Sequence, residues 1–103
     1  MTTLESQQHL ARATSLRDAS LAHDLITLRS TVAEVLRGRT EWVLVDVSGL
    51  NRPSSSAVAG LLWAKRSCMR AGVDFGVRGA RHGNRDVLRR CGLLSGPDPL
   101  DRS

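Results

Sequence analysis

Three consecutive serines, Ser54–Ser56, are the side chains of this chain whose type and position best suit chemistry. They follow a short valine-rich run, Trp42–Val47, and precede a helical pattern that ends near Gly72. Open α/β sheets bind ligands outside the carboxyl ends of their parallel strands, and a helix N-terminus stabilises negative charge. A phosphate on one of these serines would therefore be tolerated, and it would add about −1.5 to −2 charges to the surface. The alternative is that the three serines only cap the helix.

The remaining reactive side chains form no catalytic pattern. The three histidines are scattered, and none has a second ligand at metal spacing, so we expect no metal site. No nucleophile-elbow pattern surrounds the serines, and Gly76–Gly79 lacks the spacing of a phosphate-cradling loop. Asp46 is the one carboxylate in an apolar strand, and we interpret it as an acceptor for loop N–H groups rather than as a catalytic group. We expect neither an enzyme nor a cofactor.

Periodicity and turn residues indicate the elements that must position the serines. Trp42–Val47 is a short β-branched run, typical of a strand that is buried on both faces of a parallel sheet. Pro53 breaks this run, the serines offer N-cap side chains, and Gly72 is placed to terminate the helix that follows. Val73–Val77 is predicted to be the next strand. The order strand, helix, strand indicates a right-handed crossover between two parallel strands.

Two further helices are predicted. Ala19–Arg37 should begin at an N-cap, Ser20, and stop at Gly38. Its apolar stripe contains Leu21, Leu25, Leu28, Val32, Val35 and Leu36, whereas His23, Asp24, Arg29, Ser30 and Glu34 lie off the stripe and should face water. A short last helix, Arg85–Cys91, should be capped by Asn84 and should turn Val87, Leu88 and Cys91 inward. Cys68 and Cys91 both lie on apolar helix faces, so we expect two buried, reduced and inert thiols.

The helix after the serines has an outer face with an unusual composition. At 100° per residue its apolar residues gather on one side, and Trp63 falls nearly opposite the centre of that side. An outward tryptophan beside small residues and arginine is typical of an interface, although a neighbouring element could instead cover it. The predicted docking surface consists of Ser54, Ser55, Ser56, Ala59, Trp63 and Arg70.

Length and composition limit the classes of protein that remain. The chain has 103 residues, which is enough for one small domain with one core. It carries 15 basic and 10 acidic residues, a formal charge of +5, but no tyrosine and one phenylalanine. Because no basic cluster is interleaved with stacking aromatics, we do not expect nucleic-acid binding. No signal peptide or long apolar run is apparent, so we expect a cytoplasmic protein without membrane insertion.

The central motif resembles a known family. Asp46-Val47-Ser48-Gly49-Leu50, then Ser55-Ser56-Ala57-Val58, then Leu61-Leu62 is similar to the heart of the STAS domain, the domain of sulfate transporters and anti-sigma factor antagonists. In this resemblance Ser55 falls on the serine or threonine that a partner kinase phosphorylates, and Ser56 falls on the family's second serine. Ser54 stands where the family has aspartate. Val87–Leu93 resembles the family's last conserved segment, so the resemblance covers about residues 15–94.

The resemblance implies one α/β domain with a small mixed sheet, a degenerate N-terminal hairpin and a short C-terminus. Only residues 9–14 are suited to a strand of that hairpin. We therefore divide the chain into a weakly structured segment or edge strand (1–14), the STAS-like domain (15–94) and a flexible tail (95–103).

The resemblance also implies a function. We expect a non-enzymatic regulatory protein most like an anti-sigma factor antagonist, which binds an anti-sigma factor with kinase activity and so releases a sigma factor. One alternative is a STAS subunit of a stressosome-like or lipid-transport assembly. An alternative of another class is a basic nucleic-acid-associated domain.

Overall fold

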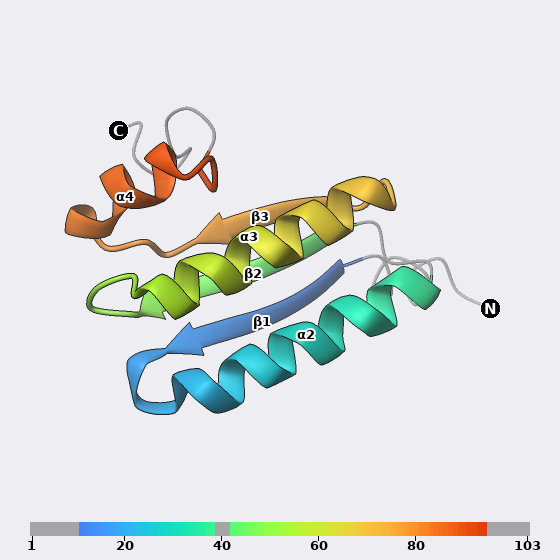
Figure 1. The fold of residues 1–103 in the computed structure, drawn as a ribbon, viewed down its shortest axis with the longest axis horizontal. Coiled ribbons are helices and arrows are strands. Elements are labelled where there is room, and N and C mark those ends of the chain that lie inside the picture. Colours follow the sequence, from blue (N-terminus) through green and yellow to red (C-terminus); the bar gives the residue numbers. More distant parts are fainter. Residues whose placement is uncertain (1–10, 39–41, 95–103) are drawn as a thin grey trace.

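The valine-rich run forms the central strand, β2 (Trp42–Gly49), of the computed structural model, which describes residues 11–38 and 42–94 (Figure 1). Within these residues the sheet has three strands in the order β1-β2-β3, and both pairs are parallel. The elements are β1 (Ala11–Arg17), η1 (Asp18–Ser20), α2 (Leu21–Arg37), β2, α3 (Ser55–Arg70), β3 (Asp74–Arg78), η2 (His82–Asn84) and α4 (Arg85–Arg90).

The predicted α/β class and the parallel crossover through α3 are confirmed. The described strands are all parallel rather than mixed, because a helix joins each strand to the next. β1 runs to Arg17, beyond the predicted end of this strand, because Leu16 near its end is buried in the core. Residues 1–10 of the predicted hairpin and the predicted tail at 95–103 lie outside the described residues.

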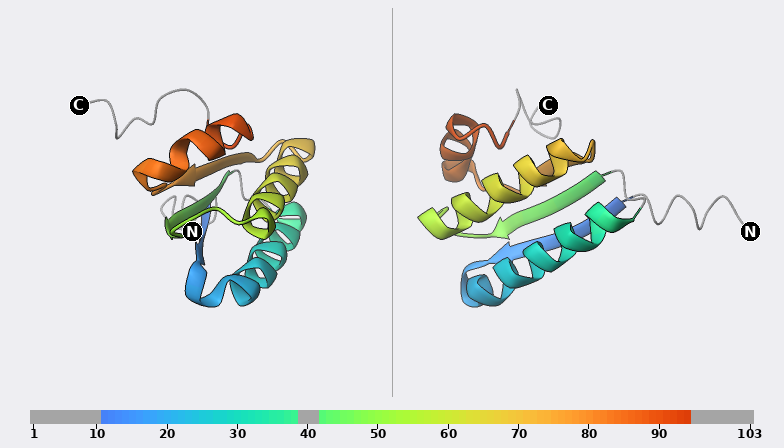
Figure 2. Two further views of the ribbon diagram at one scale, coloured as in Figure 1. Left: turned by 60° about the vertical axis from the view of Figure 1, so that its left-hand side comes forward. Right: turned by 45° about the vertical axis from the view of Figure 1, so that its right-hand side comes forward.

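Helices α2 and α3 lie side by side on the same face of the sheet (Figure 2). Right-handed crossovers between strands that follow chain order place successive helices on one face. Val43, Val45 and Val47 point to this face and are at most 1% exposed. Trp42 and Leu44 point to the other face, where Trp42 is 41% exposed. The prediction that both faces of β2 are buried is therefore wrong, since the core of the described residues lies on one face of this strand.

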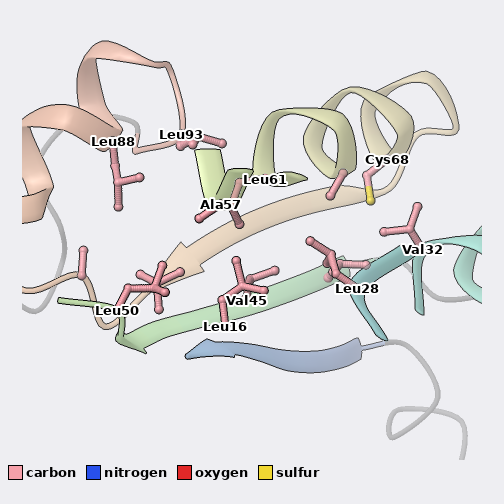
Figure 3. Close-up of a cluster of buried hydrophobic side chains, with 14 of the residues drawn as sticks. Leu16, Leu28, Val32, Val45, Leu50, Ala57, Leu61, Cys68, Leu88 and Leu93 are labelled. Carbon is pink, nitrogen blue, oxygen red and sulfur yellow. The ribbon is translucent and has the colours of Figure 1, made fainter. Parts of the chain in front are cut away.

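The core joins every layer of the domain. Figure 3 shows side chains from the strands, the helices and the loops meeting above β2. On α2 the predicted stripe is confirmed at Leu28, Val32 and Val35, whereas Leu36 is 45% exposed near the end of the helix. The largest fully buried side chains are Leu16, Leu28, Leu50, Leu61, Leu88, Val32, Val35, Val43, Val45, Val47 and Cys68.

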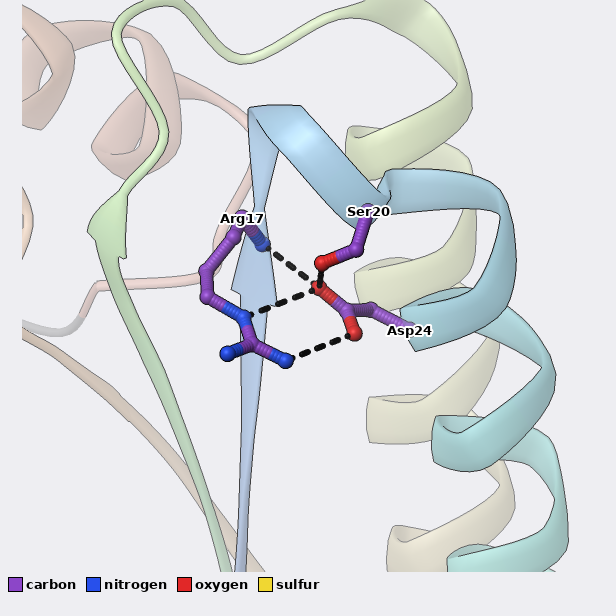
Figure 4. Close-up of polar contacts among 3 residues, drawn as sticks. All are labelled: Arg17, Ser20 and Asp24. Atoms are coloured by element: carbon purple, nitrogen blue, oxygen red, sulfur yellow. Dashed lines mark hydrogen bonds and ion pairs between the residues drawn. The ribbon is translucent and has the colours of Figure 1, made fainter.

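Asp24 is the main exception to the predicted pattern of α2, because it is buried at 3% exposure instead of facing water. Its carboxylate accepts hydrogen bonds from the Arg17 N–H at 2.9 Å and the Ser20 hydroxyl at 2.9 Å (Figure 4). It also forms an ion pair with the Arg17 guanidinium at 3.2 Å. Ser20 therefore serves Asp24 rather than capping the helix with its side chain. These contacts fix the end of β1 to the first turn of α2.

The pKa of Asp24 reflects two opposed effects. Burial alone would raise it, but the hydrogen bonds from Arg17 and Ser20 and the charge of Arg17 together lower the pKa below its usual value. The ionised carboxylate is thus the form that the fold stabilises.

The last helix completes the core at the carboxyl end of the sheet. Leu88 is buried as predicted, but Val87 is 39% exposed and Cys91 is only half-buried, because α4 has just six residues and presents a single side to the core. Asn84 is not a side-chain cap; its amide donates to the Leu50 carbonyl at 3.1 Å. The ammonium of Lys65 donates to the Gly92 carbonyl, which ties α3 to the end of α4.

We predict that Val45→Asp abolishes folding. An unpaired buried carboxylate costs several kcal/mol, against a total stability of roughly 5–10 kcal/mol for a domain of this size. Leu44→Asp, one residue away on the other face, is the matched control and should remain folded. Circular dichroism and thermal melting measure both variants. A Val45→Asp protein that melts like the wild type would refute the position of β2 in the core.

We predict that Asp24→Asn destabilises the domain by about 2 kcal/mol at pH 7, because a buried, hydrogen-bonded carboxylate is lost. Since folding lowers the pKa of Asp24, its contribution is complete above the unfolded pKa near ~3.9. That contribution disappears as the pH falls through the lower folded value. Urea unfolding between pH 7 and pH 3 should therefore give a flatter stability profile for the variant. Parallel profiles for the two proteins would contradict the assignment.

Candidate docking site at the first turn and outer face of α3

The loop between β2 and α3 is fixed by groups from both neighbouring connections. The Asn51 N–H donates to the Asp18 carboxylate at 2.7 Å, which links the loop to η1. On the other side the guanidinium of Arg81 donates to the Ser48 carbonyl at 3.1 Å. The amide of Asn84 holds the Leu50 carbonyl in the same region. The serines at the start of α3 are thus presented by a loop with defined geometry.

Asp46 has the structural role that its position in the strand predicted. Its carboxylate accepts the Ser48 N–H at 2.8 Å and lies 3.8 Å from the Arg78 guanidinium. Hydrogen bonds from the Ser48 N–H and hydroxyl, with the charge of Arg78, lower the pKa of Asp46. Gly79 passes close by with φ of +77°, and a Cβ there would lie 2.7 Å from the Asp46 Oδ1. These contacts hold the carboxylate against β2 and the end of β3, although its side chain remains 33% exposed.

The three serines at the start of α3 have different hydrogen bonds. The Ser54 hydroxyl accepts the Ala57 N–H at 3.2 Å, so Ser54 caps the helix as its residue type predicted. Ser55 and Ser56 are both exposed, and neither hydroxyl bonds to any residue in the described part of the chain. Their backbone N–H groups have no acceptor within the helix, because the first N–H groups of any helix lack one. Capping accounts for Ser54 alone and leaves Ser55 and Ser56 available.

The outer face of α3, defined here as Ser56, Ala59, Trp63, Arg66 and Arg70, continues from this turn. Trp63 is 39% exposed, on the side of the helix that periodicity predicted. A shallow pocket of roughly 280 Å³ surrounds it. Its lining residues are Ala59, Leu62, Trp63, Arg66, Ser67 and Arg70. The predicted docking residues Ala59, Trp63 and Arg70 thus meet in one hollow.

Sequence reasoning missed two residues of this surface. Arg66 lines the Trp63 pocket, and the helical spacing from Trp63 to Arg70 would have identified it. Arg29 comes from α2, and its guanidinium carbon lies 5.6 Å from the centroid of the Trp63 ring. No pattern within α3 could indicate Arg29, because it depends on how α2 packs beside α3.

The described side chains were also compared with what a reactive thiol, a metal site or a membrane span would need. Burial raises the pKa of the Cys68 thiol, which disfavours the reactive thiolate. In the part of the chain that the structure describes, no three His, Cys, Asp or Glu side chains gather as metal ligands would. None of the helices within those residues is long and apolar enough to cross a membrane.

Comparison with known families identifies the class of protein. The family described as "Mlab, STAS domain" matches residues 15–95, which is most of the chain. The chain therefore belongs to the STAS domain family, and the resemblance carried by the central motif is confirmed. No curated protein and no solved structure matches the chain. Family membership supports a regulatory STAS-type protein that acts through protein–protein interaction.

We predict that Ser54→Ala lowers the free energy of unfolding by about 1 kcal/mol, the usual effect of removing a helix cap. Ser56→Ala is the matched control two residues along, and it should change stability little because its hydroxyl bonds nothing in the described fold. Urea unfolding of the two variants measures the difference. Equal losses of stability would show that capping is shared between the serines.

Proposed function

We propose that this domain is a non-enzymatic regulatory binding protein of the anti-sigma factor antagonist type, which binds an anti-sigma factor with kinase activity in the cytoplasm. The observation that carries the proposal is the free, exposed Ser55 at the start of α3, directly above an outer face that holds Trp63 and Arg70. Ser55 is the residue that falls on the phosphorylated position of the family. One surface thus combines a site for modification with a hydrophobic anchor for docking.

The proposed switch works through charge. The partner kinase transfers the γ-phosphoryl group of ATP to the Ser55 hydroxyl oxygen: the bond from the γ-phosphorus to the bridging oxygen breaks, ADP leaves, and the hydroxyl proton passes to solvent. The domain itself tolerates the phosphate, because free N–H groups and the helix dipole at the first turn of α3 favour negative charge. The same phosphate adds about −1.5 to −2 charges to the docking surface, which weakens binding by repulsion or by loss of hydration. Release of the partner and integrity of the fold are therefore separable.

The residue type at position 54 separates two versions of the proposal, one in which Ser55 is phosphorylated and one in which the domain only docks. The family has aspartate at this position, and aspartate would both cap the helix and place a negative charge beside Ser55. Ser54 retains the cap but not the charge. Docking through Trp63 and Arg70 does not depend on this residue. A binding protein that has lost the switch is the second candidate, and it would suit a STAS subunit that stays permanently within a larger assembly.

We predict that Trp63→Ala weakens binding of the partner by on the order of 2 kcal/mol, the range of an interface hot spot, with little loss of stability. The partner to use is an anti-sigma kinase encoded beside the gene for this chain, and calorimetric titration measures the affinity. Trp42→Ala is the matched control, because Trp42 is equally exposed but lies on the opposite side of the sheet. Trp63→Ala protein that is unfolded would show instead that Trp63 belongs to the core.

We predict that Ser55→Asp weakens the same complex, whereas Ser55→Ala binds like the wild type. Incubation of the wild type with the kinase and labelled ATP should label Ser55 and leave the Ser55→Ala variant unlabelled. Equal affinity of Ser55→Asp and wild type, together with absent labelling, would contradict the switch and favour the permanent subunit.

A further inference from the structure

A groove runs between α2 and α3 beside the proposed docking surface. Its volume is roughly 320 Å³, and the two helices that form it lie side by side in the left view of Figure 2. Its lining, named here the two-helix groove, consists of Leu25, Leu28, Arg29, Ser56, Ala59 and Gly60. Leucine and alanine make its walls apolar, whereas one guanidinium and one hydroxyl supply its polar groups.

Gly60 gives the groove its shape. A Cβ at this position would lie 2.6 Å from the Leu25 Cδ2, so any larger residue would displace that leucine. Because Gly60 has no side chain, Leu25 rests against the backbone of α3 and forms part of the groove wall. The groove is thus built by the packing of the two helices.

Charge is distributed unevenly around this groove. α3 contains no acidic residue. The two acidic residues of α2 are both engaged with β1, since Asp24 binds Arg17 and Glu34 forms an ion pair with Arg12 at 2.9 Å. The exposed arginines on this side are Arg29, Arg66 and Arg70, and none of them pairs with a carboxylate in the described part of the chain.

Arg29 stands where the groove and the outer face of α3 meet. Its guanidinium lies over the Trp63 ring, a contact that is weak at an exposed site compared with a charge-assisted hydrogen bond to a carboxylate. The exposed Ser56 hydroxyl lines the same groove and has a free donor. An acidic side chain entering the groove would therefore meet a cation and a hydroxyl between apolar walls.

The composition of the groove favours a protein partner over nucleic acid. Single-stranded nucleic acid needs successive aromatic side chains on which its bases stack, and Trp63 is the single aromatic residue of α2 and α3. A leucine-walled groove suits an aliphatic side chain beside the acidic one. The chain's own charge of +5 disfavours a second copy as the occupant.

We propose that the two-helix groove receives an acidic segment of a partner protein, in which an aspartate or glutamate pairs with Arg29 and a neighbouring apolar side chain packs against Leu25 and Ala59. This inference rests on the proposed function, because it takes the outer face of α3 to be a protein-docking surface. It extends that surface to α2 and defines the chemistry of the segment that binds there.

The test begins with an unbiased library of displayed 12-residue peptides selected on the intact chain. We expect selected sequences to be enriched in aspartate or glutamate next to leucine, isoleucine or phenylalanine. A fluorescent synthetic copy of the commonest peptide then gives the dissociation constant by anisotropy. Arg29→Glu should weaken that binding about tenfold or more, and replacing the peptide's acidic residue by its amide should weaken it similarly. A selection that yields no acidic enrichment, or no binder, would overturn the inference.

Matched variants isolate the role of Arg29. Arg90→Glu, on α4, makes the same change in net charge away from the groove and should leave the dissociation constant within about twofold. A peptide with lysine in place of its acidic residue should bind Arg29→Glu better than it binds the wild type. Unchanged affinity of Arg29→Glu for the acidic peptide, in a variant that melts like the wild type, would overturn the proposed pairing.

Other occupants are outcomes of the same experiments. A 12-nucleotide single-stranded DNA that binds more tightly than the peptide and loses affinity in Arg29→Glu would favour nucleic acid and overturn the inference. Sedimentation showing a dimer that Arg29→Glu dissociates would favour a second copy and overturn it as well.

Failure of this inference is distinguishable from failure of the proposed function. A kinase complex weakened by Trp63→Ala but not by Arg29→Glu rejects the groove alone, whereas peptide binding through Arg29 without any effect of Ser55 variants rejects the switch alone.

Discussion

In the described residues, helices α2 and α3 cover one face of the parallel sheet, and the rest of this structure depends on that constraint. The strands follow chain order, so right-handed crossovers place α2 and α3 next to each other on a single face. That arrangement directs the valines of β2 into one core and leaves Trp42 on the other side. It also brings together, at the carboxyl edge, the three loops that follow β1, β2 and β3. Hydrogen bonds between these loops fix the position of the start of α3. The two-helix groove, and the position of Arg29 beside Trp63, are both consequences of this adjacency.

Acidic and basic residues are used for different purposes in the described domain. Asp18, Asp24 and Asp46 each bind backbone N–H groups at the carboxyl edge and so shape its loops. The arginines of the helices mostly point outward, and those beside Trp63 form no ion pair with a carboxylate in the described residues. The internal use of carboxylates therefore leaves a basic exterior on α2 and α3. The hydrogen bonds that stabilise these loops thus also account for the basic character of this surface.

Local patterns predicted the elements well, and tertiary packing determined what they missed. The run of valines predicted β2, and the serines predicted the start of α3. Both predictions succeeded because they depend on residues that are close together in the sequence. Asp24 was misassigned because its charge suggested water, although it lies one turn from Leu28 on the apolar stripe. Its partner, Arg17, belongs to the preceding strand and is brought near only by the fold. Arg29 is exposed as predicted, but its contact with Trp63 could not be predicted, because that contact depends on the packing of two helices from separate parts of the sequence.

The packing of Leu25 against Gly60 has a consequence for the thermodynamics of recognition. Leu25 fills the space that a Cβ at position 60 would need, and the neighbouring residue, Asp24, anchors α2 to the end of β1. The groove walls therefore lose little conformational entropy when they are occupied, since the fold has already ordered them. A flexible partner segment bears most of the ordering cost of the complex. Differences in affinity between such segments should then reflect how readily each one adopts its bound shape, more than any adjustment of this domain.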